Sequence, residues 1–315
     1  MIATGLIFTA LLLIITLDNT SADTTLSMTF GVGLTTIPPR FPTVHHVIAS
    51  WLVQQSPPAV IVVFVPQRYQ NFMSESPRNK NMNIISLSEE LAKHYPEEIS
   101  NGKIVVQALS KDWGPMSKYM GLLDHFEEYS NRFNIDYWVI GDDDVRYSDN
   151  TLSDYAAAIV RDKSVMSVST HFKVHPRVQV NMGASIVSIN HLQGVDTVLF
   201  PTALLRSGRD SARGLTLPVL MEGVRLFHQM CPDSFYQDDY IMSFLVAMSG
   251  VDVKSIWSGQ KVAHHVNSVS KSNQQMHIHP QVFQREDNTK KCIAEYGLQI
   301  SAAMEKKRLE YDREL

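Results

Sequence analysis

The chain has 315 residues, of which 44% are hydrophobic and 19% are charged, and its formal net charge is −4. This size is ample for a large core, as one big α/β domain or as two small ones. A slightly acidic chain has no basic field for nucleic acid, so we expect no nucleic-acid partner. A phosphorylated ligand would have to be held by local groups rather than by overall charge.

The first 17 residues contain no charged side chain and are mostly apolar, and Asp18 ends the run. Residues 20–22 then form a small-residue site of the kind that signal peptidase cleaves. The run is short for a membrane-spanning helix and lacks the basic start of a standard signal peptide. We expect residues 1–22 to be a signal peptide or a signal anchor, and we favour the anchor. Either role sends the remainder into the lumen of the secretory pathway.

Strand and helix patterns alternate along the first half of the chain, which predicts an α/β fold with a mostly parallel sheet. The strand candidates are apolar, β-branched runs, and the helix candidates carry apolar residues at helical spacing. The expected strands are residues 28–34, 59–65, 103–109, 137–140 and 164–168. The expected helices are residues 42–54, residues 87–94, one with Pro115 in its first turn, and one that ends at Val160.

The pattern changes after residue 170, where alternating residues 171–180 precede a turn and a strand within residues 181–188. Later elements are helices at 217–230 and 241–248, a strand at 251–257 and a charged terminal helix at 290–315. Polar segments at 67–83 and 207–214 are expected to be loops, and residues 261–279 hold four histidines among polar residues. We expect one folded domain over residues 23–289, followed by the terminal helix.

The chain has two cysteines, Cys231 and Cys292. In an oxidising compartment they could form a disulfide, and two buried thiols are the other possibility. The sequence leaves both open.

Three consecutive carboxylates, Asp142, Asp143 and Asp144, directly follow the apolar run 137–140 and Gly141. A parallel strand delivers its carboxyl end to the crevice where ligands bind. Three acids there repel one another unless a cation or hydrogen-bond donors neutralise them. A divalent ion that also clamps a diphosphate would satisfy them. A solvated acidic turn that caps the next helix is the alternative, and the buried strand before the acids favours the metal site.

Five segments follow one another in a fixed order: TTIPPR (35–40), KDWGPMSK (111–118), GDDDV (141–145), NMGAS (181–185) and YQDDY (236–240). This order resembles that of the GT-A nucleotide-sugar glycosyltransferases of the broad family-2-like kind, over roughly residues 28–270. The resemblance implies a single GT-A-like α/β domain with a mostly parallel central sheet flanked by helices. In that class a nucleotide-binding half precedes an acceptor-binding half.

The resemblance also implies residues that bind the nucleotide and the donor sugar. Thr36, Pro38 and Arg40 would line the nucleotide pocket, whereas a surface Arg that closes a loop is the alternative for Arg40. Asp112 and Lys118 match the loop that meets nucleotide or phosphate. The remaining matches, for contact with the ribose or sugar, are Asp143, Gly183 and Ala184.

The same resemblance implies that Asp142 and Asp144 form a DXD motif that holds Mn²⁺ or Mg²⁺ on the diphosphate. His264 or His265 would be a further ligand, and His265 is the one we select, with a solvated loop histidine as the alternative. Asp238 and Asp239 match an acid pair at a helix start. One of them would remove the acceptor proton, and we favour Asp239. Capping of the helix is a compatible role.

The sequence therefore predicts a metal-dependent glycosyltransferase that moves a sugar from a nucleoside-diphosphate sugar to a hydroxyl of a glycan or glycoconjugate, with inversion. It would work in the secretory pathway, as a type II membrane protein of the Golgi or endoplasmic reticulum or as a secreted protein. A nucleotidyltransferase of related fold and a non-catalytic luminal sugar-binding protein stay open as alternatives.

Overall fold

A computed structural model describes residues 28–69 and 84–162 continuously. In the second half it describes residues 168–170, 178–182, 185–189, 192, 197–206, 216–232, 237–251, 253–255, 263–265 and 280–314. The predicted signal segment, residues 1–22, and the predicted loop 207–214 lie outside these ranges. Within them, no helix combines the length and the apolar character that a membrane span requires.

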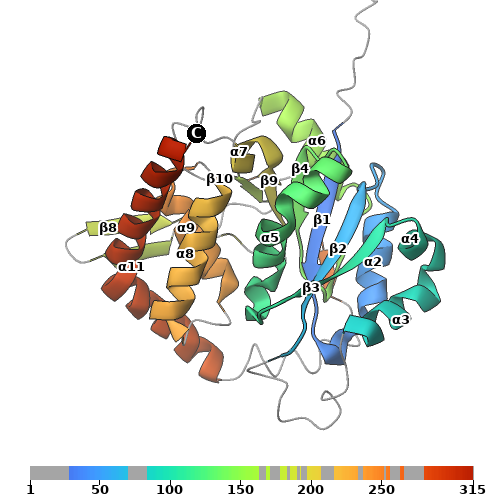
Figure 1. Cartoon of the computed structure of the whole chain (residues 1–315), viewed down its shortest axis with the longest axis horizontal. Helices are drawn as coiled ribbons and strands as arrows, with labels where there is room; N and C mark the ends of the chain where they lie inside the picture. The colour runs from blue at the N-terminus through green and yellow to red at the C-terminus, as the bar shows by residue number, and fades with distance from the viewer. Residues whose placement is uncertain are drawn as a thin grey trace, which may run out of the picture.

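A seven-stranded sheet forms the centre of the molecule, with the strand order β10-β6-β9-β4-β1-β2-β3 (Figure 1). Its first four strands in the chain are β1 (Phe30–Thr35), β2 (Val60–Pro66), β3 (Ile104–Leu109) and β4 (Tyr137–Ile140). The other three are β6 (Val168–Thr170), β9 (Val198–Pro201) and β10 (Val253–Ser255). The pairing places six strands in one direction and β9 against them. The predicted α/β class with a mostly parallel sheet flanked by helices is confirmed.

Helices cover both faces of the sheet, because successive residues of each buried strand point to opposite faces. One face packs against α2 (Val44–Leu52), α3 (Ile84–His94), α4 (Pro96–Ser100) and α6 (Thr151–Asp162). The other packs against α5 (Ser117–Arg132), α7 (Thr202–Arg206), α8 (Leu217–Met230), α9 (Asp238–Met248) and α11 (Pro280–Glu314). Figure 1 shows α8 and α11 side by side, to the left of α5 and further from the sheet. Two separate cores result, one on each side of the sheet.

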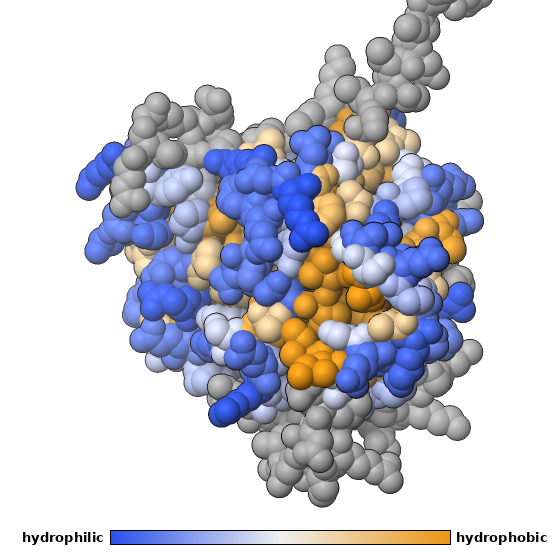
Figure 2. Space-filling view, turned by 45° about the vertical axis from the view of Figure 1, so that its right-hand side comes forward, coloured by the Kyte–Doolittle hydropathy of each residue, from blue (hydrophilic) through white to orange (hydrophobic). Residues whose placement is uncertain are grey.

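Small elements complete the fold. Two short 3₁₀ helices, η1 (Pro38–Arg40) and η2 (Gly114–Met116), follow β1 and β3. The remaining strands are β5 (Val145–Tyr147), which pairs with β11 (Ala263–His265), and the hairpin of β7 (Val178–Met182) with β8 (Ser185–Ile189). Most of the surface facing the viewer in Figure 2 is hydrophilic, with hydrophobic side chains gathered near its middle.

Several predicted bounds need correction. The predicted strand at 164–168 occurs as β6 from Val168, and α11 begins at Pro280, ten residues before the predicted start at 290. Helix α9 begins at Asp238 instead of 241, because the acid pair forms its first turn. β9 was not predicted from the sequence. Its four residues are too few to show a period, and its direction depends on β4 and β6.

The open question about the cysteines is answered by a disulfide between Cys231 and Cys292, whose Cα atoms are 5.9 Å apart. The bond joins the end of α8 to α11, and the 61-residue separation between its cysteines contains all of α9. It therefore holds α8 and α11 together beside α9.

Replacing both cysteines by serine should lower the free energy of unfolding by about 2–4 kcal/mol, because the cross-link restricts a long loop in the unfolded chain. Urea denaturation measures this loss. A reducing agent should produce the same loss in the wild-type protein and none in the double variant. Equal stability of the variant and the oxidised wild type would contradict the structural role of the disulfide.

Gly121 sets how closely α5 approaches β2. A Cβ atom added there would lie 2.3 Å from Cγ of the Phe64 ring. Gly121→Ala should therefore destabilise the protein by about 1–3 kcal/mol through overpacking. Urea denaturation of Gly121→Ala and of Gly121→Ala with Phe64→Leu tests the cause, since the smaller side chain should restore part of the loss. An unchanged denaturation midpoint in Gly121→Ala would contradict this close packing.

Candidate functional site

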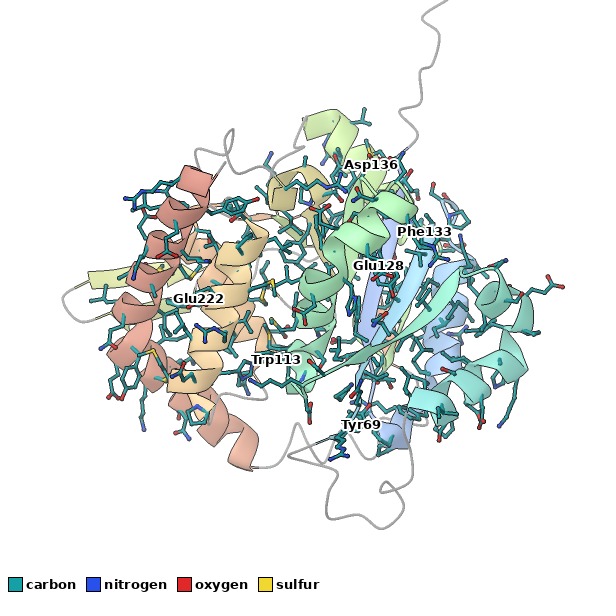
Figure 3. The ribbon with its side chains drawn as sticks, viewed as in Figure 1. Tyr69, Trp113, Glu128, Phe133, Asp136 and Glu222 are labelled. Carbon is teal, nitrogen blue, oxygen red and sulfur yellow. A yellow bond between two sulfur atoms is a disulfide. The ribbon has the colours of Figure 1, made fainter. Side chains whose placement is uncertain are left out.

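The predicted site residues gather at the edge of the sheet where the parallel strands β1 to β4 end. Each strand leads there into a loop that carries polar side chains, and such an edge is the usual ligand site of an open α/β sheet. Figure 3 shows Tyr69 and Trp113, from the loops after β2 and β3, toward this end, whereas Asp136 lies at the opposite end, before β4.

Arg40 forms ion pairs with two of the three consecutive acids. The short helix η1, which begins at Pro38, projects Arg40 across to the loop after β4. Its guanidinium forms a short hydrogen bond and ion pair with Asp143 and lies 3.2 Å from Asp144. Burial acts to lower the pKa of Arg40, but the carboxylates of Asp143 and Asp144 raise it overall. Arg40 therefore remains a cation held between the segment after β1 and the acids after β4.

Lys118 neutralises the third acid and reaches a fourth. Its Nζ atom lies 2.5 Å from Oδ1 of Asp142 and 2.8 Å from Oδ2 of Asp238, the first residue of α9. The contact with Asp238 is an ion pair without the alignment of a hydrogen bond. Lys118 is only 3% exposed, and although burial acts against the charge, Asp142 and Asp238 raise its pKa well above the usual value.

Two further loops close the site beside Arg40. The hydroxyl of Tyr69 donates a hydrogen bond to the Thr36 carbonyl oxygen, at 2.8 Å. Burial and the charges of Asp112 and Asp143 raise the pKa of Tyr69, so its phenol is neutral and close to both acids. A carboxylate oxygen of Asp112 accepts a hydrogen bond from the Gly114 amide, at 2.9 Å, and Gly114 has a φ of 59°, which favours glycine.

Several buried polar atoms at this edge have no hydrogen-bond partner in the described part of the chain. They are Thr36 Oγ1, Arg40 Nε, Asp143 Oδ2, Ser117 Oγ and Tyr119 Oη. Buried polar groups are nearly always hydrogen-bonded, so a group of unmade bonds at one edge indicates a place for a polar ligand.

The structure brings most of the predicted site residues together. The segments after β1, β3 and β4 and the starts of α5 and α9 contribute Thr36, Arg40, Asp112, Lys118, Asp142, Asp143, Asp144 and Asp238. Asp239 follows on α9, half-buried, and its charge acts on both Lys118 and Tyr119. Pro38 is buried at the start of η1.

Three predicted residues lack a described side chain. Gly183 and Ala184 lie outside the described residues. The backbone of His265 pairs with Val145, directly after the acid triplet, but its side chain is outside the described part. Their roles stay predictions.

The sequence reading missed Tyr69 and Tyr119. Tyr69 stands in a polar segment without periodicity, and Tyr119 has the pattern of an ordinary buried helix residue. No sequence signal marked either one. Trp113 packs in the core cluster, with Lys111 Nζ 3.6 Å from its ring centre and the His228 ring at 5.3 Å.

The charges of the site suit a divalent cation. Four carboxylates, Asp142, Asp143, Asp144 and Asp238, form ion pairs with only two cations, Arg40 and Lys118. Their oxygen atoms are the donors that Mg²⁺ and Mn²⁺ prefer. Among the residues that the structure describes, no group of three histidine, cysteine or acidic side chains could hold a metal ion by itself. An ion here would need oxygen atoms from a ligand as well.

Comparison with known proteins gave matches among solved structures alone, since no family model and no curated protein sequence matches the chain. TarS of S. aureus is similar with a TM-score of 0.42 and 15% identity, over 80% of this chain and 39% of that one. TarS 1–349 in complex with UDP-GlcNAc has a TM-score of 0.40 and 14% identity, over 75% and 58%. For 4-diphosphocytidyl-2C-methyl-D-erythritol synthase the TM-score is 0.40 and the identity 9%, over 79% and 98%. The chain thus spans well under half of the first TarS structure.

Arg40→Met should lower the free energy of unfolding by about 3 kcal/mol, because it leaves two nearly buried carboxylates without their cation. Arg40→Lys should lower the free energy of unfolding by less, because it keeps the positive charge. Some loss should remain, because lysine lacks the forked geometry of the guanidinium. Urea denaturation measures both. Adding Asp143→Asn to Arg40→Met should restore stability, and further loss in that double variant would contradict the pairing.

Proposed function

We propose that this protein is a glycosyltransferase that moves a sugar from a nucleoside-diphosphate sugar to a hydroxyl of a glycan or glycoconjugate. One observation carries the proposal. Arg40, Lys118 and the carboxylates that follow β4 and begin α9 meet at the carboxyl edge of the sheet, beside buried polar atoms without a partner among the described residues. Together with a divalent ion, Arg40 and these polar atoms would suit a ligand that is both anionic and rich in hydroxyl groups.

The nucleotide and diphosphate would occupy the side of the site near β1. Thr36, Arg40, Asp112 and Tyr69 offer hydrogen-bond groups to a nucleoside. Asp144, with Asp142 or Asp143, would hold Mn²⁺ or Mg²⁺ together with diphosphate oxygens. A divalent ion supplies positive charge for the leaving nucleoside diphosphate.

The acceptor would occupy the side near α9. Asp239 would take the proton from the acceptor hydroxyl while the oxygen of that hydroxyl bonds to the anomeric carbon of the donor sugar. The bond from that carbon to the diphosphate breaks, and its electron pair leaves with the diphosphate. A single direct displacement of this kind inverts the anomeric configuration.

The secretory pathway is the compartment we propose. The disulfide between Cys231 and Cys292 supports it, because such bonds persist in oxidising compartments. The apolar segment at residues 1–17 would anchor the protein in the membrane or direct its export.

Thermal unfolding with UDP, GDP, CDP and ADP tests the proposed function, and UDP is the first choice because a similar structure is a complex with UDP. One nucleotide should raise the unfolding midpoint with Mn²⁺, since a ligand at 100 times its dissociation constant adds about 2.7 kcal/mol of stability. EDTA and Asp144→Ala should each abolish the rise.

Asp136→Asn is the matched control, because it alters an acid at the opposite end of β4 and should leave the rise intact. No response to any nucleoside diphosphate would overturn the proposal. A response to a nucleoside triphosphate with a sugar phosphate, and turnover of that pair, would instead favour a nucleotidyltransferase.

A further inference from the structure

Lys118 connects two parts of the site that are far apart in the chain. Asp142 follows β4, on the side of the proposed donor, and Asp238 begins α9, on the side of the proposed acceptor. The ammonium group of Lys118 contacts both carboxylates, at 2.5 and 2.8 Å. The Lys118 side chain is 4% exposed, so a ligand has little access to it.

Packing fixes the position of this ammonium group. Lys118 is the second residue of α5, which lies close against β2 through Gly121. The neighbouring Tyr119 ring lies 5.5 Å from Lys118 Nζ, and its edge packs on Phe200 at 6.2 Å. A cation in the first turn of a helix opposes the helix dipole, so the two carboxylates must account for its place there.

The contacts also distinguish the two acids of α9. Asp238 is 8% exposed and paired with Lys118, whereas Asp239 is half-buried. Adjacent residues point about 100° apart around a helix, so both carboxylates cannot face Lys118 alike. An orientation of the first turn that keeps Asp238 on Lys118 therefore turns the Asp239 side chain in another direction.

We propose that Lys118 is a positioning residue that couples the donor acid Asp142 to the first turn of α9, holding Asp238 in place and presenting Asp239 to the acceptor. The inference rests on the proposed function for the role of Asp239. It assigns Lys118 a place between the two halves of the site instead of the phosphate contact that the sequence suggested. A change at Asp142 should therefore reach α9 through Lys118.

Hydrogen exchange without any ligand tests the coupling. Asp142→Asn and Lys118→Met should each speed amide exchange in residues 239–243 by about tenfold, although neither residue lies on α9. Amide exchange in Asp142→Asn with Lys118→Met should be no faster than in Lys118→Met alone, because both substitutions act through one ion bridge. Asp136→Asn, at the other end of β4, is the matched control and should leave α9 unchanged. If amide exchange in α9 is as slow in Asp142→Asn and in Lys118→Met as it is in Asp136→Asn, the proposal is overturned.

A second arm uses UDP with Mn²⁺ as the probe. UDP should slow exchange in the first turn of α9 in the wild type and in Lys118→Arg, which keeps the charge. The double variant Lys118→Met with Asp238→Asn leaves no unpaired carboxylate at position 238. Its dissociation constant for UDP should stay within about threefold of the wild-type value, but UDP should no longer slow amide exchange in α9. A merely structural lysine would not separate binding from this response.

The outcomes separate this proposal from the proposed function. If UDP binding is lost in Lys118→Met with Asp238→Asn but retained in Lys118→Arg, Lys118 contacts the nucleotide and the coupling role is wrong. If the wild type binds no nucleoside diphosphate, the proposed function fails, and the ligand-free exchange still decides whether the bridge exists.

Discussion

Carboxylate repulsion at the end of β4 is the constraint on which the site depends. Asp142, Asp143 and Asp144 follow a fully buried strand, and Asp143 and Asp144 are themselves nearly buried. Charges in such surroundings are strongly destabilising unless they are paired. Two cations solve the problem, Arg40 from the loop after β1 and Lys118 from the start of α5. The fold must therefore bring these two segments to the end of β4.

The parallel sheet does this by simple geometry. Strands β1, β2, β3 and β4 run in the same direction, so their following loops meet at one edge. The proline-containing helix η1 turns Arg40 toward the acids, and Gly121 lets α5 approach β2 closely enough to bury Lys118. The arrangement is costly, since four carboxylates meet two cations and several buried polar atoms have no partner in the part of the chain that the structure describes. Such a cost is typical of sites shaped for a ligand rather than for stability.

The site also joins the two halves of the domain. Lys118 links the end of β4 to α9, and the disulfide of Cys231 with Cys292 holds the helices around α9. The proposed transferase would have to bring a donor and an acceptor into one geometry, because small errors in their placement slow a reaction strongly. A buried ion bridge and a covalent bond are two rigid ways to maintain that geometry.

The sequence determined the local elements and the order of the motifs. Apolar runs such as residues 59–65 and the helical period of residues 217–230 depend on neighbouring residues, and both were predicted within a residue or two. The acid triplet 142–144 and the pair Asp238 and Asp239 could be recognised in the sequence because each consists of consecutive residues. The tertiary structure alone decided the partners of Lys118, the direction of β9, the disulfide and the place of Tyr69. Each of these is a contact between segments far apart in the chain, and local periodicity carries no information about which distant segment will pack against it.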